Sequence, residues 1–211
     1  MKEHNYTIPL NEALESNVSC FLCKIEDTLE ERAVDYYMGA AVMEPGVRIE
    51  TNEKGFCRHH AEIMLNMPKK LPLMLALETR LDALEKALAK EKAPAKAVKH
   101  TCAVCERTAR QMDKCLDNCV WLLRKEPDFL EKYLHSEGVC LHHFYALSKR
   151  LGRGDKALYA ALHKAMTEKL HALREDINTF TKSFDYRFTP PEGIGQVPPR
   201  AVETLTGKKG Y

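Results

Sequence analysis

Apolar residues recur at steps of three and four along most of the chain, which is the periodicity of amphipathic helices. No alternation of the kind that marks a β-strand accompanies it. The pattern therefore predicts an all-α protein. The predicted helices cover residues 24–38, 59–67, 106–123 and 142–151, with longer helices through residues 77–88 and 158–184.

Proline and glycine mark the breaks between these helices. We expect a short helix from Pro9, an irregular stretch through Pro45 and Gly46, a short helix after Pro127 and a last one over residues 200–207. The leucines of the two long helices are expected in a core, paired within one chain or between two chains. From residue 186 the tail is Pro-rich and extended. The aromatic residues around its start, Phe184, Tyr186 and Phe188, are expected to pack on the protein itself, with docking to a partner as the alternative.

Six of the eight cysteines form two matching groups. Each group has a CxxC motif followed by a Cys-x-His-His motif, and the offset between the groups is 82 residues for the first motif and 83 for the second. Such a match indicates an internal duplication. We divide the chain into a leader (1–19), a first copy (20–90), a linker (91–100), a second copy (101–185) and a tail (186–211).

A CxxC paired with a CxxH has the ligand types and the spacing of a structural zinc site. Thiolate and imidazole suit a borderline-soft dication. Each motif also precedes a helix, whose N-terminal partial charge favours the thiolate. The sequence therefore predicts two Zn²⁺ per chain, each held by the two motifs of one copy. The predicted ligands are Cys20, Cys23, Cys57 and His60 in the first copy and Cys102, Cys105, Cys140 and His143 in the second.

The choice between adjacent histidines rests on helical geometry. Residues three apart share a helix face, whereas residues two apart do not. Cys57 and His60 are three apart, as are Cys140 and His143. We therefore prefer these two histidines as ligands. The adjacent His59 and His142 either lie next to the ligands without binding the metal, or they are alternative ligands.

Other cysteine chemistries fit less well. A disulfide framework needs an oxidising compartment, and a thioredoxin-like motif needs a βαβ pattern; the sequence indicates neither. An iron–sulfur cluster or haem stays open as a less favoured alternative. Cys115 and Cys119 have no counterpart in the first copy and share an apolar stripe with Leu116, so we expect them to be core thiols.

Composition and charge restrict the classes of function and of partner that fit the sequence. Among the 211 residues, 45% are hydrophobic and 29% charged, which is typical of a folded protein. The net charge of +2 would fall to zero with two Zn²⁺ on six thiolates, so nucleic acid is an improbable partner. The longest apolar run, residues 71–77, is too short to span a membrane. The first 16 residues lack a secretory signal, so we expect a cytoplasmic protein.

Motifs for catalysis are absent from the sequence. It has no phosphate-binding loop, no HExxH and no GxSxG, and a Cys3His zinc ion has no open position for water. Whether the protein is an enzyme stays open, but the sequence favours a non-enzymatic interaction or regulatory module, acting on a protein partner or as a homodimer. The alternatives are a thiol-based redox or metal sensor, and an iron-dependent redox protein.

Several motifs in combination resemble a bacterial family, domain of unknown function 6062. They are YTIPLNEAL, CFLC, GFCRHH, CAVC, GVCLHH, FDYRF and PPRAVETLTG, and together they extend over nearly the whole chain. Members typically have proline where Phe21 stands here. The family pattern implies the same two ligand sets, one in each copy. The resemblance implies a bacterial cytosolic protein and supplies no activity.

Overall fold

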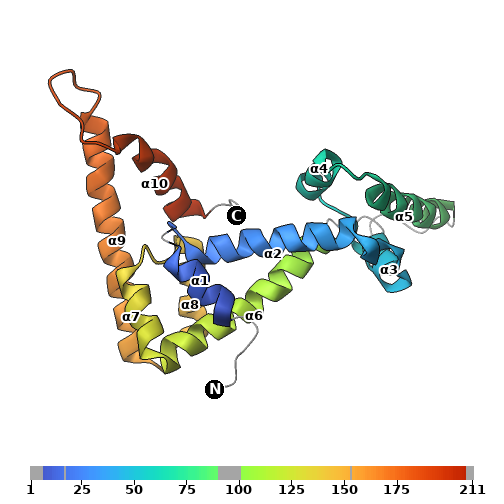
Figure 1. Cartoon of the computed structure of the whole chain (residues 1–211), viewed down its shortest axis with the longest axis horizontal. Coiled ribbons are helices and arrows are strands. Elements are labelled where there is room, and N and C mark those ends of the chain that lie inside the picture. Colours follow the sequence, from blue (N-terminus) through green and yellow to red (C-terminus); the bar gives the residue numbers. More distant parts are fainter. Residues whose placement is uncertain (1–6, 17, 90–100, 153, 208–211) are drawn as a thin grey trace. The chain divides into compact units, whose positions relative to one another are not determined.

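The computed structural model describes residues 7–16, 18–89, 101–152 and 154–207. Every regular element in this part of the chain is a helix (Figure 1), so the all-α prediction is confirmed. The elements are α1 (Thr7–Glu15), α2 (Phe21–Met38), the 3-10 helix η1 (Ala40–Met43), α3 (Pro45–Lys54), α4 (Arg58–Asn66), α5 (Leu71–Ala89), α6 (Ala103–Lys125), α7 (Pro127–His135), α8 (Leu141–Leu151), α9 (Lys156–Lys182), the 3-10 helix η3 (Ile194–Gln196) and α10 (Val197–Thr206).

The duplication is visible in the order of the helices. Helices α2 to α5 of the first copy correspond to α6 to α9 of the second, and each series begins at a CxxC motif.

The prediction for the stretch after α2 was wrong. The stretch around Pro45 is not irregular but forms α3, with Pro45 in its first turn, where the missing N–H costs no hydrogen bond. Pro127 begins the corresponding helix α7 in the same way.

The chain divides into two compact units whose boundaries lie inside the CxxC helices. Unit 1 comprises the described residues up to Ile25 and from Asp113 onward, and unit 2 comprises Glu26–Met112. Helices α2 and α6 therefore each contribute residues to both units. The predicted linker, residues 91–100, lies outside the described residues.

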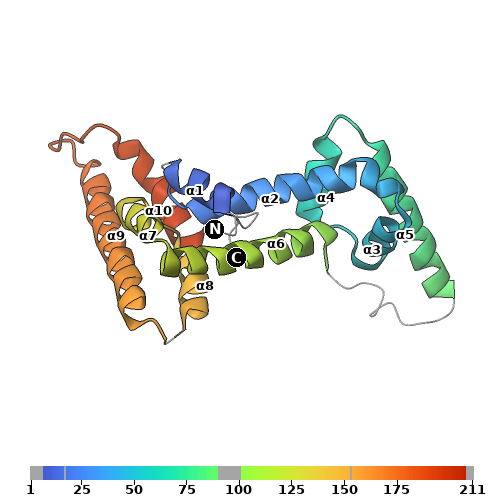
Figure 2. The same ribbon diagram turned by 60° about the horizontal axis from the view of Figure 1, so that its bottom comes forward.

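Unit 2 is built around Tyr37, Met64 and Leu73, which are at most 2% exposed. Helix α5 packs against α3 and η1 (Figure 2) and buries Leu73 and Ala76 there. The leucine stripe predicted to be core lies on another face of this helix. Leu81 and Leu88 are each 59% exposed, so this stripe of α5 does not form a core within the single chain.

Unit 1 buries the apolar stripe of α9, as expected, with Leu162, Met166 and Leu173 in its core. Helix α10 packs against α9 and α8. The tail aromatics do not all pack on the protein: Phe184 is 78% and Tyr186 94% exposed, which corrects the sequence-based expectation. None of the described helices combines the length and apolar character needed to cross a membrane.

Cys115 and Cys119 belong to the core of unit 1. They are 1% and 0% exposed. Burial raises the pKa of Cys115 to about 11 and also raises that of Cys119. These thiols are therefore protonated core side chains at neutral pH, as the sequence predicted.

Candidate metal centres

The eight predicted ligands converge on two clusters of four. Cluster 1 consists of Cys20, Cys23, Cys140 and His143, and lies in unit 1. Cluster 2 consists of Cys57, His60, Cys102 and Cys105, and lies in unit 2. Within each cluster the ligand atoms lie within 4.8 Å of one another.

The pairing of the motifs differs from the prediction. Each CxxC meets the CxxH of the other copy, and not that of its own. A backbone hydrogen bond accompanies each exchange: Phe21 N–H donates to Gly138 O at 3.4 Å, and Ala103 N–H donates to Gly55 O at 3.0 Å.

The length of the CxxC helices explains this exchange. Helix α2 continues for 18 residues without interruption, which is about 27 Å at the α-helical rise. The chain is thus carried far from Cys23 before it turns toward Cys57. Helix α6, with 23 residues, does the same after Cys105. Motif spacing indicates which residues are candidate ligands, but it does not show where the long helix after a CxxC motif places the next motif.

The two clusters have the dimensions of a tetrahedral metal site. The Sγ atoms of Cys23 and Cys140 are 3.7 Å apart in cluster 1. Those of Cys57 and Cys105 are 3.9 Å apart in cluster 2. His143 Nδ1 lies 3.4–3.5 Å from the three thiols of cluster 1, and His60 Nδ1 lies 3.1–3.4 Å from those of cluster 2.

These separations are those expected around a zinc ion. With Zn–S bonds of about 2.3 Å and Zn–N bonds of about 2.0 Å, a tetrahedron has S···S edges of about 3.8 Å and S···N edges of about 3.5 Å. The two S···S separations and five of the six S···N separations agree with these values, and the sixth, from Cys57 Sγ to His60 Nδ1, is shorter at 3.1 Å. Each cluster therefore fits one ion held by three thiolates and one imidazole.

The turn before each CxxH is the same in both copies. Gly55 and Gly138 have φ values of 65° and 67°, in the left-handed region that glycine tolerates best. Two residues later, Cys57 and Cys140 precede α4 and α8 with nearly equal extended backbones, at φ −71°, ψ 165° and φ −74°, ψ 167°. The turn at the glycine thus orients the cysteine side chain toward the cluster.

The first helical turn then brings in the histidine. His60 and His143 lie three residues after their cysteines and are 3% and 2% exposed. The side chain of His59 is 66% exposed and its Nε2 lies 4.0 Å from Glu30 Oε1. The structure therefore places His60 and His143 among the thiols, with His59 outside cluster 2.

Cluster 1 is enclosed by protein. Its four ligands are at most 3% exposed. The Lys169 ammonium donates hydrogen bonds to the carbonyls of Ser19 at 2.8 Å and Val139 at 3.3 Å. These carbonyls directly precede Cys20 and Cys140. Lys169 thus links the two motifs and places a positive charge beside a site at which three thiolates and a bound dication would sum to −1.

Cluster 2 is open to solvent on one side. Cys105 is exposed and Cys57 partly exposed, whereas Cys102 and His60 are 4% and 3% exposed. His60 Nε2 lies 2.8 Å from Glu30 Oε1. A carboxylate in this position fixes the tautomer, so that Nδ1 stays available for a metal, and makes the imidazole a better ligand.

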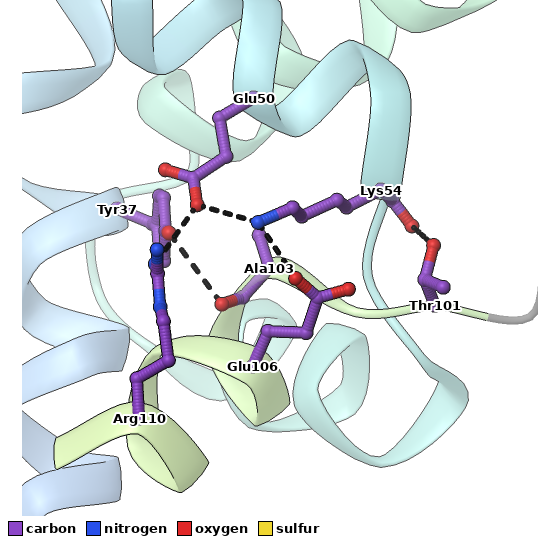
Figure 3. Close-up of polar contacts among 7 residues, drawn as sticks. All are labelled: Tyr37, Glu50, Lys54, Thr101, Ala103, Glu106 and Arg110. Atoms are coloured by element: carbon purple, nitrogen blue, oxygen red, sulfur yellow. Dashed lines mark hydrogen bonds and ion pairs between the residues drawn. The ribbon is translucent and has the colours of Figure 1, made fainter.

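A polar network holds the start of α6 against α3 (Figure 3). Lys54 Nζ lies 3.0 Å from Glu50 Oε1 and 2.7 Å from Glu106 Oε2, and these hydrogen bonds, that to Glu106 foremost, raise the pKa of Lys54. Tyr37 donates a hydrogen bond to the carbonyl of Ala103 at 3.5 Å. The network anchors the turn that carries Cys102 and Cys105. Sequence reasoning found none of these contacts, because none belongs to a recurrent motif.

Metal binding to these thiols is coupled to proton release. In cluster 2, partial desolvation of the Cys105 thiol, whose residue is exposed at the surface, and then the neighbouring Cys102 and Cys57, raise the pKa of Cys105 to about 12. In cluster 1, hydrogen bonds with Cys20 and Cys23 lower the pKa of Cys140. In cluster 2 a bound cation would replace the proton that Cys105 otherwise retains.

Fold and site together define an all-helical protein with two Cys3His clusters suited to metal ions. The family model described as a family of unknown function (DUF6062) matches residues 1–208. The chain belongs to this family, as its motifs predicted. No curated protein matches the chain, and no solved structure matches it.

Proposed function

We propose that the protein binds two Zn²⁺ ions as structural ions of a non-enzymatic interaction or regulatory module. The observation that carries this proposal is the tetrahedral arrangement of three thiols and one imidazole in both clusters, with S···S separations of 3.7 and 3.9 Å. Thiolate and imidazole donors favour zinc over the hard cations, which take oxygen ligands.

The same distances argue against an iron–sulfur cluster. Ligand atoms within 4.8 Å of one another enclose a single ion, whereas an iron–sulfur cluster places two or more irons and their sulfides between its ligands and is held by four cysteines in the usual case. A mononuclear zinc ion with four protein ligands has no open position for water. That closed coordination supports a structural role over a catalytic one.

The structural role follows from what each ion would connect. Cluster 1 joins the turn at Cys20 to the turn at Cys140, and cluster 2 joins the turn at Cys57 to the turn at Cys102. In zinc-finger peptides such sites contribute roughly 10–16 kcal/mol of apparent binding free energy, which acts as folding free energy. Each unit of this protein has one such cross-link.

We place the protein in the bacterial cytoplasm, where cysteines stay reduced; none of the eight cysteines forms a disulfide in the structure. An interaction role is supported by the exposed apolar side chains of α5, among them Leu81 and Leu88. The partner is a second protein or a second copy of this chain. A sensor role has specific support only at cluster 2, whose Cys105 is exposed.

Elemental analysis combined with an absorption spectrum tests the proposal. The protein is purified under reducing conditions without added metal, and we expect two zinc atoms per chain with no visible bands. Iron with visible absorption, or protein without metal, would overturn it. Cys23→Ser and Cys105→Ser should each reduce the zinc content to one, because each variant removes a ligand from a different cluster.

A further inference from the structure

The two clusters share ligands and geometry but differ in exposure. In cluster 2 the exposed Cys105 and the partly exposed Cys57 have Sγ atoms 3.9 Å apart. By the repeat, their counterparts in cluster 1 are Cys23 and Cys140, whose Sγ atoms are 3.7 Å apart and which are 3% and 0% exposed. The molecule therefore carries the same pair of thiols twice, once open to solvent and once buried.

The end of α10 accounts for the burial of the pair in cluster 1. Gly207, which ends α10, lies against both thiols: a Cβ atom at this position would be 3.5 Å from Cys140 Sγ and 3.9 Å from Cys23 Sγ. Helix α10 belongs to the tail that follows the second copy. A solvent-borne oxidant must therefore displace this segment to reach cluster 1, whereas Cys105 is already accessible.

We propose that Cys57 and Cys105 form a hydroperoxide-sensitive pair, whose oxidation to a disulfide releases the zinc ion of cluster 2 while cluster 1 retains its own. This inference rests on the proposed zinc binding. Cys105 is the thiolate that reacts first, because it is the most exposed ligand of either cluster. Cys57 is the thiolate that resolves the intermediate, because its Sγ lies 3.9 Å away on the same open side.

The chemistry proceeds in two steps that balance. The Cys105 thiolate attacks one oxygen of the hydroperoxide; an S–O bond forms, the O–O bond breaks, and the leaving oxygen takes a proton to become water or an alcohol. The Cys57 thiolate then attacks the sulfenic sulfur, forming the S–S bond and expelling hydroxide, which takes a second proton. The two thiolates supply the two electrons that reduce the peroxide.

The loss of two thiolates explains why the ion would leave. The sulfur atoms close from 3.9 Å to a bond of about 2.0 Å, and neither sulfur then carries the negative charge that binds zinc. Cys102 and His60 alone remain as ligands of cluster 2. Two ligands do not complete the tetrahedral coordination of a structural zinc site.

The experiment uses the full-length protein, with its zinc content measured first. Hydrogen peroxide is added at a stoichiometric amount with a zinc-binding dye, and the products are digested with trypsin without reduction. We expect one zinc ion released per chain and the peptide of residues 55–58 linked to that of residues 100–107, which contain Cys57 and Cys105. Fragmentation of the linked pair distinguishes Cys105 from Cys102. Reductant with added zinc should restore the starting content.

Matched variants separate reactivity from folding. Cys57→Asp offers a carboxylate ligand that zinc accepts but that cannot form a disulfide; release should be slower than in the wild type, because the sulfenic acid at Cys105 loses its resolving thiolate. Cys140→Asp makes the same change at the equivalent position of cluster 1 and should leave the rate of release from cluster 2 unchanged. If Cys57→Asp fails to bind two ions, the peptide map of the wild-type protein still shows whether a disulfide forms between Cys57 and Cys105.

Three outcomes would overturn the inference: release of both ions at one rate, retention of both, or a disulfide between Cys102 and Cys105 in place of the expected one. A protein that contains no zinc before oxidation would instead contradict the proposed function. The starting zinc content therefore distinguishes the two failures.

Discussion

The Sγ atom of Cys23 lies 3.7 Å from that of Cys140, a residue 117 positions further along the chain. The first CxxC is thus completed by the second CxxH. The reciprocal exchange brings His60 Nδ1 to 3.4 Å from Cys102 Sγ in cluster 2. Each metal ion would therefore connect the two copies of the duplication to each other.

Pairs of substitutions report this exchange directly. Cys20→Ser combined with Cys140→Ser removes two ligands of one cluster, so we expect the loss of one zinc ion per chain. Cys20→Ser combined with Cys57→Ser removes one ligand from each cluster and should cost both ions. If each copy closed its own site, the two results would be reversed. Zinc content measured by elemental analysis, with helicity by circular dichroism, distinguishes the arrangements.

Glu30 should increase the zinc affinity of cluster 2 without being a ligand itself. Its carboxylate lies 2.8 Å from His60 Nε2, so we expect Glu30→Gln to weaken zinc binding at cluster 2 by about 10–100-fold, the range found for such outer partners. Competition with a chelator measures the two affinities, and that of cluster 1 should not change. The exposed neighbour Glu31 provides the control, since Glu31→Gln removes an equal charge without this contact. Equal affinities in both variants would contradict the role of Glu30.

Substitution of Gly138 should lower the stability of the protein because of the backbone conformation at this position. With φ at 67°, an alanine there costs about 1–2 kcal/mol of stability, although its Cβ would meet only Tyr133 Oη, at 4.0 Å. We therefore expect Gly138→Ala to lower the thermal midpoint in the zinc-bound state. Gly195→Ala is a suitable control, since a Cβ there has nothing within 4 Å and the φ of Gly195 lies outside the left-handed region. A similar midpoint in both variants would mean that the turn relaxes.

Zinc affinity of cluster 2 should rise with pH through the neutral range. Without a cation, partial desolvation of the thiol together with Cys102 and Cys57 raises the pKa of Cys105 to about 12, so zinc must displace its proton. Because the bound thiolate has a lower pKa than the free thiol, the stabilisation by zinc is present at higher pH and is lost as pH falls. We expect up to about a tenfold gain in affinity per pH unit for each proton released. Chelator competition at two pH values, corrected for the chelator's own protonation, measures the gain, and a flat profile would contradict the coupling.

The sequence predicted the helices and the eight side chains that meet in the two clusters, because both follow local rules. Helical periodicity marks α9, and the i, i+3 spacing selects His60 over His59. The exchange of motifs follows from the direction and length of α2, which no motif encodes. Helix α3 was missed because Pro45 and Gly46 suggest a break as readily as a first turn. The exposure of Leu81 depends on which face of α5 meets α3, and Glu30 stands 30 residues before its partner His60, with no spacing rule to connect them.

The exchange also determines what a single copy of the repeat is able to do. Produced alone, it would carry one CxxC and one CxxH held apart by its own long helix, and it would complete a tetrahedron only by domain swapping with a second molecule, as in a two-fold symmetric dimer. Joining two copies in one chain converts that bimolecular association into an intramolecular one. Both ions then bind with an affinity that no longer depends on protein concentration.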